Sequence, residues 1–442
     1  IEYQSGARPP HSKETQAMVD IKLLVIQICV ILVASYSAGW LLSRFRQPQV
    51  VGEMVAGVLL GPSLLGWLAP GFFAALFPPE SLGPLSVLSQ IGLLLFMFMI
   101  GLELDTKKLR KLGHVAVVIS HTSIIVPFAL GALLALFLFP KVADESLPFT
   151  GFVLFMGAAM SVTAFPVLAR ILDERNLLGT KLGTLTIACA AVDDVTAWCL
   201  LAVIIAIVKS EVNHLPLWQM LPGVVVYLAL MLYVIRPVFR ELLARESDAT
   251  KNDKLIVVLL VCMLASSWAT EWLGIHALFG AFFAGVIVPK ENGFTENVRS
   301  RLQLPVVVLL IPLFFAFTGL RTSIGLISGS EMILYCGLVF LVAVAGKFGG
   351  SMIAARVMGT PWREAASIGI LMNTRGLIEL VILNIGLDIG VLTRPLFSIM
   401  VLMAVGTTVM TTPLLSLIYP EQEKSLSKHE AMSLNEPHAL TP

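Results

Sequence analysis

The sequence predicts an all-α integral membrane protein of about thirteen transmembrane helices, and three observations lead to this fold class. Apolar residues make up 57% of the 442 residues and charged residues only 13%, well below the quarter that is usual in soluble proteins. Apolar runs long enough to cross a bilayer recur along the chain, since about 20 helical residues span a hydrocarbon core. Lysine and arginine gather in alternate connections between these runs, as the positive-inside rule requires of a multi-pass protein.

The apolar runs give thirteen candidate spans, of which the ninth is the shortest. They lie near residues 21–43, 49–69, 83–103, 113–139, 149–172, 181–209, 217–238, 254–273, 275–288, 303–321, 331–357, 362–387 and 392–418. Basic residues concentrate in the odd-numbered connections from the first to the eleventh. We therefore expect the amino terminus outside and the carboxyl terminus in the cytoplasm, with a bacterial inner membrane as the location.

A long charged linker near residues 236–254 separates two halves of opposite predicted topology. Two inverted-topology repeats of this kind are typical of secondary transporters. The predicted parts are an extracytoplasmic segment at 1–20, a first six-helix repeat at 21–210, a linker helix and cytoplasmic loop at 211–253, a second six-helix repeat at 254–420 and a cytoplasmic tail at 421–442. The segment at 1–20 can be residue from expression or processing and is left out of the fold prediction.

Composition also excludes several classes of protein. A net charge of +1 gives no basic surface for nucleic acid. The five cysteines lie in apolar runs without CxxC spacing, and the histidines form no HExxH motif, so neither a disulfide framework nor a zinc site is indicated. We expect the lipid bilayer as the main partner, with no nucleic-acid partner and no resident cofactor.

The strongest chemical signal is the segment AAVDDVTAW at residues 190–198, in the middle of the sixth span. A charged side chain at the bilayer centre costs about 3 kcal/mol on insertion scales, so the adjacent Asp193 and Asp194 indicate function. Neighbouring helical residues point about 100° apart, so the two carboxylates cannot face one partner. We expect one of them to face a basic residue across the bundle and the other to meet a transported ion.

Lys347 is the predicted basic partner, because it lies at the centre of the eleventh span in AVAGKFGGSM. Its place about ten residues from either end of that span argues against a lysine that extends to the interface. The flanking glycines would allow another backbone to approach closely.

Two spans carry features that interrupt a helix. In SVTAFPVLAR (161–170), Pro166 cannot donate to the helical ladder, and in MNTRGLIELV (372–381) the centre of the twelfth span is too polar for lipid contact. Broken helices at membrane depth line cavities, where their free ends bind ions in transporters. We expect two broken crossing helices, with Arg375 and Glu379 paired along one helix face.

Together these motifs resemble the monovalent cation/proton antiporter superfamily. The resemblance rests on QPQVVGEMVAGVLLGPSLLG (47–66), LFMFMIGLELD (95–105), TAFPVLARIL (163–172), the two aspartates, Lys347 and NTRGLIELVILNIG (373–386), and it covers about residues 21–420. The match is closest to the branch of bacterial sodium/proton exchangers, Kef-like potassium systems and plant cation/proton exchangers. It implies a NapA-like fold of thirteen helices, usually dimeric, in which spans four to six and eleven to thirteen move against a scaffold.

The resemblance also assigns roles to residues. Asp194 resembles the aspartate that binds the cation and the proton, and Asp193 resembles the neighbour that pairs with the lysine at position 347. The first helix break corresponds to Thr163, Ala164, Phe165 and Pro166, the second to Asn373, Thr374, Arg375 and Gly376, with Ser161 and Glu379 in support. Asp194, Asp193 and Thr163 are then the expected ligands of Na⁺ or K⁺. Kef-like systems usually show QD in place of DD and carry a nucleotide-binding domain, and we expect no nucleotide partner here.

The predicted function is therefore the exchange of Na⁺ or K⁺ for protons by alternating access, performed by a transporter and not by an enzyme. Two alternatives remain: another ion-coupled transporter such as a symporter, and an intramembrane aspartyl protease, which would need aspartates on separate helices. If Lys347 releases its proton when a cation binds, two protons move per cation, and the sequence favours this electrogenic exchange.

Overall fold

The computed structural model describes residues 20–45, 47–103, 114–142, 148–175, 177, 180–213, 217–245, 253–274, 276–290 and 293–419. Within these ranges the chain is helical, with turns and short extended breaks and without a strand. The predicted segments at 1–20 and 421–442 lie outside the described residues, apart from Asp20, whose side chain caps the first helix. The all-α prediction is confirmed.

The first half of the chain forms nine described α-helices and one 3₁₀ turn. They are α1 (Ile21–Ser43), α2 (Gln49–Leu60), α3 (Leu65–Leu68), α4 (Pro70–Leu76), η1 (Pro79–Ser81), α5 (Leu82–Glu103), α7 (His114–Val142), α8 (Phe149–Ser161), α9 (Phe165–Glu174) and α10 (Lys181–Asn213).

The second half contains further α-helices and three π-helical segments, η2, η4 and η6, among its described residues. The elements are α11 (Leu217–Leu230), η2 (Met231–Ile235), α12 (Arg236–Arg245), α13 (Asp253–Trp272), α14 (Ala277–Ile287), α15 (Phe294–Gln303), η4 (Leu304–Leu310), α16 (Ile311–Leu320), η5 (Ile324–Leu326), α17 (Ser330–Val344), η6 (Ala345–Gly349), α18 (Gly350–Val357), α19 (Trp362–Met372), α20 (Leu377–Asp388) and α21 (Arg394–Ile418).

The described helices make this a multi-pass membrane protein. Ten helical stretches are long and apolar enough to cross a membrane, and the bent pair of α19 and α20 makes eleven. Helices α8 and α14, at the places of the predicted fifth and ninth spans, are apolar but shorter. The exact number of thirteen spans is thus not confirmed and stays a prediction.

Both predicted helix breaks are present, and they lie at corresponding places in the two halves. Helix α8 ends at Ser161 and α9 begins at Phe165, so residues 162–164 form the first break. Helix α19 ends at Met372 and α20 begins at Leu377, with a bend of 43° across residues 373–376. The interruptions that Pro166 and the polar segment of span twelve indicated are therefore confirmed.

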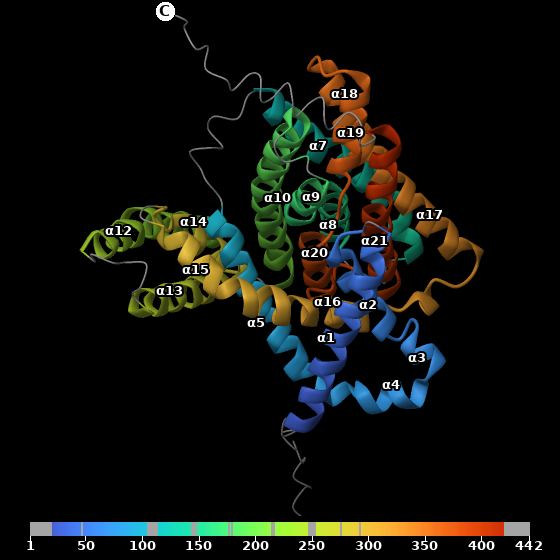
Figure 1. Cartoon of the computed structure of the whole chain (residues 1–442), viewed down its shortest axis with the longest axis horizontal. Coiled ribbons are helices and arrows are strands. Elements are labelled where there is room, and N and C mark those ends of the chain that lie inside the picture. The colour runs from blue at the N-terminus through green and yellow to red at the C-terminus, as the bar shows by residue number, and fades with distance from the viewer. Residues whose placement is uncertain are drawn as a thin grey trace, which may run out of the picture.

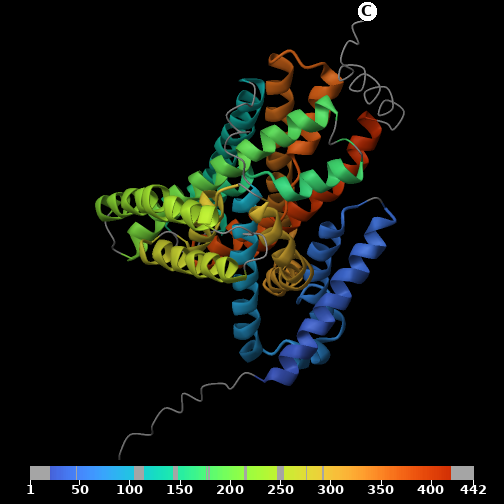
Figure 2. The same cartoon turned by 60° about the vertical axis from the view of Figure 1, so that its left-hand side comes forward.

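The helices pack in two groups (Figures 1 and 2). The framing group consists of α1, α2, α5, α13, α14 and α16, and in Figure 1 it runs from α13 and α14 on the left through α5 and α16 to α1 and α2. The crossing group consists of α7–α10 and α17–α21 and contains both breaks. Packing within each group is much more extensive than packing between the groups.

Small residues hold the framing group together. A Cβ atom on Gly319 of α16 would lie 1.9 Å from the Gly57 carbonyl of α2, and a Cβ on Gly57 would lie 2.2 Å from the carbonyl oxygen of Phe315. The two backbones can approach this closely only because neither residue has a side chain, which is the usual basis of helix association in membranes.

Replacing Gly319 with alanine should therefore destabilise the protein. The added methyl group would overlap backbone atoms of α2, and overpacking of this kind costs about 1–3 kcal/mol. The matched control is Gly337→Ala, because the Cβ there would meet no heavy atom within 4 Å. We expect a lower thermal midpoint in detergent for Gly319→Ala and no decrease for Gly337→Ala; equal midpoints would contradict this account of the packing.

Candidate functional site

The carboxylate of Asp193 lies at the centre of the crossing group, and four side chains donate to it. Its Oδ1 accepts from the Ser120 hydroxyl at 3.0 Å and the Ser123 hydroxyl at 2.7 Å, both on α7. Its Oδ2 accepts from Thr163 Oγ1 in the first helix break at 2.6 Å and from Lys347 Nζ at 2.7 Å. Hydrogen bonds and an opposite charge together compensate the loss of water around a buried carboxylate.

Lys347 is fully buried in the π-helical segment η6 and forms the predicted ion pair with Asp193. Its ammonium group also donates to the Ser123 carbonyl at 2.9 Å and to the Ser161 carbonyl, which ends helix α8. An ammonium group has three protons, so each proton of Lys347 has a strong acceptor. The lysine thereby joins three separate segments of the crossing group.

Asp194, the next residue on α10, has a different environment. It is 5% exposed, and its carboxylate forms no ion pair within the described chain. Oδ1 lacks a hydrogen-bond partner among the described residues, while the backbone amide of Phe165, at the start of α9, donates to the carboxylate. The amino end of a helix favours a negative charge, but one amide leaves most of the hydrogen-bonding capacity of a carboxylate unused.

The two helix breaks touch each other beside the aspartates. The backbone amide of Ala164 donates to the carbonyl of Thr374 at 3.0 Å, which links the two helix breaks through their backbones. Thr163 Oγ1 lies 3.1 Å from the Met372 carbonyl in addition to its contact with Asp193, and a hydroxyl can donate to only one of them at a time. A Cβ atom on Gly376 would lie 3.3 Å from the Cβ of Ala164, so the breaks pack closely.

Arg375 supplies donors to the free end of the first broken helix. Its guanidinium group donates to the carbonyls of Ala159 and Met160 at 2.8 Å each, and these are among the last carbonyls of α8, which have no partner within the helix. Arg375 also pairs with Glu379 at 3.1 Å, as predicted. Both side chains are fully buried, so the pair stabilises the crossing from inside the group.

The positions of the predicted site residues are thus mostly accounted for. The pairing of Lys347 with Asp193 and of Arg375 with Glu379 is confirmed. Ser161 contributes through its carbonyl, since its hydroxyl bonds to Ala158. Pro166 is the second residue of α9, where a missing amide proton costs no helical bond.

Sequence reasoning missed Ser120 and Ser123. They lie three residues apart on α7, on either side of His121 and Thr122, and this spacing places them on one helix face. That spacing was the available signal, but serine and threonine are common in membrane helices, so their presence indicates function much less than a charged residue does. Asn373, which was predicted, has a buried Oδ1 without a partner among the described residues.

The oxygen ligands available at the crossing suit a hard monovalent cation better than a resident transition metal. No group of three or more His, Cys, Asp or Glu residues that could hold a metal ion occurs in the described chain. The unpartnered acceptors at the crossing, among the described residues, are oxygens: Asp194 Oδ1, Asn373 Oδ1 and Glu379 Oε2, of which the Glu379 carboxylate is already paired with Arg375. Unwound backbone and carboxylate oxygens of this kind bind Na⁺ in transporters, and such an ion is cargo and not a cofactor.

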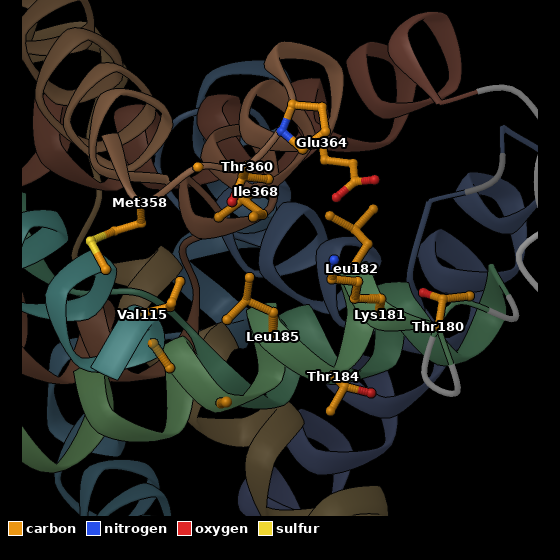
Figure 3. Close-up of a pocket in the computed structure, with 14 residues that line it drawn as sticks. Val115, Thr180, Lys181, Leu182, Thr184, Leu185, Met358, Thr360, Glu364 and Ile368 are labelled. Carbon is orange, nitrogen blue, oxygen red and sulfur yellow. The ribbon is translucent and has the colours of Figure 1, made fainter. Parts of the chain in front are cut away.

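A separate pocket of about 660 Å³ lies where α10 begins (Figure 3). Val115 of α7, Lys181 and Leu185 of α10, and Thr360 and Glu364 near the start of α19 surround it. Its lining includes neither Asp193 nor Asp194, so it is separate from the aspartate pair.

Comparison with known proteins identifies the family. The family model described as "Sodium/hydrogen exchanger, transmembrane" matches residues 30–417. The Na(+)/H(+) antiporter NhaS4 of Synechocystis is 41% identical over 400 residues, which cover 90% of this chain and 97% of that protein. The Cation/H(+) antiporter 17 of Arabidopsis thaliana is 41% identical over 92% of this chain, and the K(+)/H(+) antiporter 1 of Saccharomyces cerevisiae is 32% identical over 96%. The chain spans about half the length of these plant and yeast relatives.

A solved structure supports the fold independently. The sodium proton antiporter MjNhaP1 of Methanocaldococcus jannaschii, at pH 8, superposes with a TM-score of 0.61 over 94% of this chain and all of that one, at 14% sequence identity. At such low identity the likeness establishes the fold alone. The antiporter-like helical fold that the sequence predicted is thereby confirmed.

Proposed function

Because the chain belongs to the sodium/hydrogen exchanger family, we propose that it exchanges a monovalent cation, Na⁺ or K⁺, for protons across a membrane by alternating access. The family is one of transporters and not of enzymes. The relatives include a sodium/proton antiporter, a potassium/proton antiporter and a cation/proton antiporter, so both cations are candidates.

One observation carries the proposal: Asp194 is the carboxylate at the crossing that lacks a basic partner. Lys347 balances the charge of Asp193, and Arg375 balances that of Glu379. A buried and unbalanced carboxylate is costly in free energy, so it takes up either a proton or a cation. Competition between these two for the same oxygens is the essence of exchange.

The proposed cycle follows from that competition. Asp194 binds a cation on one side of the membrane, and the crossing group then moves against the framing group. On the other side a proton displaces the cation, and the protonated, uncharged site returns. Alternating access by motion of one bundle around a midplane site is the common pattern of transporters with broken helices. Thr163 and Asn373 are the further proposed ligands, since both belong to the helix breaks.

The number of protons per cation depends on Lys347. Buried lysines lose their proton readily, which favoured two protons per cation from the sequence alone. The three acceptors around Lys347 Nζ weigh against that release, because a departing proton would leave a buried carbonyl without this donor or the Asp193 carboxylate without its opposite charge. We therefore propose that Asp193 and Lys347 remain paired and that Asp194 carries one charge in each direction.

The assembly and orientation are proposed from the resemblance and the charge pattern. The resemblance suggests a homodimer and a bacterial inner membrane. The concentration of basic residues in the odd-numbered connections supports an amino terminus outside and a carboxyl terminus in the cytoplasm. In this orientation α10 begins at the cytoplasmic side and ends at the outer side.

Reconstitution tests both the exchange and its ratio. Proteoliposomes that contain the purified chain and an internal pH dye should show proton movement when Na⁺ or K⁺ is added, with Li⁺ compared alongside. Protons should move opposite to the cation, whereas movement in the same direction would indicate a symporter. Recording on a solid-supported membrane should give no cation-induced current for one-to-one exchange. A current from actively exchanging protein would restore the two-proton ratio, and absence of any proton movement would refute the function.

A further inference from the structure

Trp198 lies on the same face of α10 as Asp194 and contacts the framing group. Residues four apart on a helix lie one above the other, so the indole is one turn beyond the carboxylate toward the end of α10. Asp193 points about 100° away, into the crossing group. Asp194 and Trp198 therefore face the boundary between the two groups, across which transport requires motion.

The partners of Trp198 are two phenylalanines of α14. The ring of Phe279 meets the indole edge-on, with centroids 5.6 Å apart, and the ring of Phe282 stacks on it at 6.5 Å. Trp198 is 2% exposed, so its indole is shielded from water, while Phe279 and Phe282 are partly buried. Edge-on and offset-stacked arrangements are the favourable ones for aromatic pairs.

Helix α14, which carries the two phenylalanines, packs closely against α13 and α5. A Cβ on Gly280 would lie 2.3 Å from the Ser266 carbonyl oxygen of α13, and a Cβ on Gly285 would lie 2.3 Å from the Phe98 carbonyl oxygen of α5. Because α14 is packed backbone to backbone on two sides, it belongs rigidly to the framing group. Movement of α10 relative to that group must then separate Trp198 from the phenylalanines.

The indole N–H supports a role for the ring beyond core packing. It is buried and has no hydrogen-bond partner among the described residues, although buried tryptophans usually find one. An unpaired donor costs free energy, so this packing is less stable than a fully satisfied one. Separating the rings therefore costs less free energy than opening a contact with all of its hydrogen bonds made.

Other contacts between the groups lie toward the same face of the molecule. Arg321 at the end of α16 pairs with Asp388 at the end of α20, and Asn384 donates to Thr318 at 2.8 Å. A Cβ on Gly151 would touch both Val208 near the end of α10 and Val391 just after α20, which places these ends together. The contacts of Arg321 and Thr318 therefore join the two groups at the face where α10 ends.

We propose that Trp198, packed against Phe279 and Phe282, is the seal that closes the Asp194 site toward the face where α10 ends. The inference rests on the proposed exchange and adds an access-controlling residue to it. In the sealed state a proton or cation reaches Asp194 only from the opposite side. During transport the ring leaves α14 as the crossing group moves, and the site opens to the other solution.

Removing the ring should uncouple the transporter. In proteoliposomes with an imposed pH gradient and no Na⁺ or K⁺, Trp198→Ala should dissipate the gradient several-fold faster than the wild-type protein. Trp198→Phe keeps an aromatic ring in place, so it should dissipate the gradient no faster than the wild-type protein. Adding Asp194→Asn to Trp198→Ala should remove the leak, because the leaking protons pass through that carboxylate. The matched control is Trp268→Ala, whose indole is 70% exposed on α13.

Each outcome decides the proposal. A Trp198→Ala protein that exchanges cations with no added leak would overturn the seal, while wild-type exchange would leave the proposed function intact. A wild-type protein without exchange would instead refute the function. If Trp198→Ala fails to fold, the Phe279→Leu and Phe282→Leu double variant removes the same contact from the other side and must leak. A leak that persists with Asp194→Asn would also contradict the proposal.

Discussion

Replacing Asp194 with asparagine should abolish cation-driven proton movement, down to the level of empty liposomes. Asparagine has the size of aspartate and keeps a carbonyl oxygen toward the Phe165 amide, but it carries no charge to attract a cation and takes up no proton near neutral pH. The substitution should therefore abolish transport and leave the fold unchanged. The measurement is dye-reported proton movement on addition of Na⁺ or K⁺ to matched proteoliposomes.

Two controls make that result specific. Asp173→Asn applies the same chemical change to an exposed residue of α9 and should leave exchange unaltered. The thermal midpoint of Asp194→Asn should equal or exceed that of the wild type, because the change removes a buried negative charge without a basic partner. Exchange at the wild-type rate by Asp194→Asn would end the assignment of this residue as the carrier.

The sequence identified the charged part of the site because charges are costly in a bilayer. Asp193, Asp194 and Lys347 each stand in a long apolar run, and an ionisable group at that depth requires a partner or a function. The breaks were predictable for a related reason: Pro166 removes a helical donor, and the polar residues 373–376 cannot face lipid. Both signals are local and visible in a single sequence.

The parts that sequence reasoning missed depend on contacts between distant segments. Ser120 and Ser123 are more than 60 residues from Asp193, and a serine in an apolar helix is inexpensive and common. The role of Trp198 depends on which face of α10 meets α14, and hydrophobicity is uninformative where both faces are apolar. The sequence did predict spans at the places of α8 and α14, but both helices are shorter than a full span, so the total of thirteen stays a prediction.

Replacing Lys347 with methionine should strongly destabilise the protein. Methionine fills a similar volume but leaves the Asp193 carboxylate as an uncompensated buried charge and removes donors from the Ser123 and Ser161 carbonyls. Removing one partner of a buried ion pair costs about 3–5 kcal/mol, more than most single substitutions. We expect this loss in equilibrium denaturation in mixed micelles, with little folded protein after mild heating.

A double variant distinguishes the effect of the uncompensated charge of Asp193 from the effect of losing the Lys347 side chain. Asp193→Asn added to Lys347→Met removes the uncompensated charge, and the Ser120 and Ser123 hydroxyls can still donate to the amide oxygen. Most of the lost stability should return, so the two substitutions should be strongly non-additive in a double-mutant cycle. Additive losses would show that Lys347 stabilises the crossing through its carbonyl contacts and not through Asp193. If the restored double variant still exchanges cations through Asp194, the pair supports the site without carrying cargo, which is what one-to-one exchange requires.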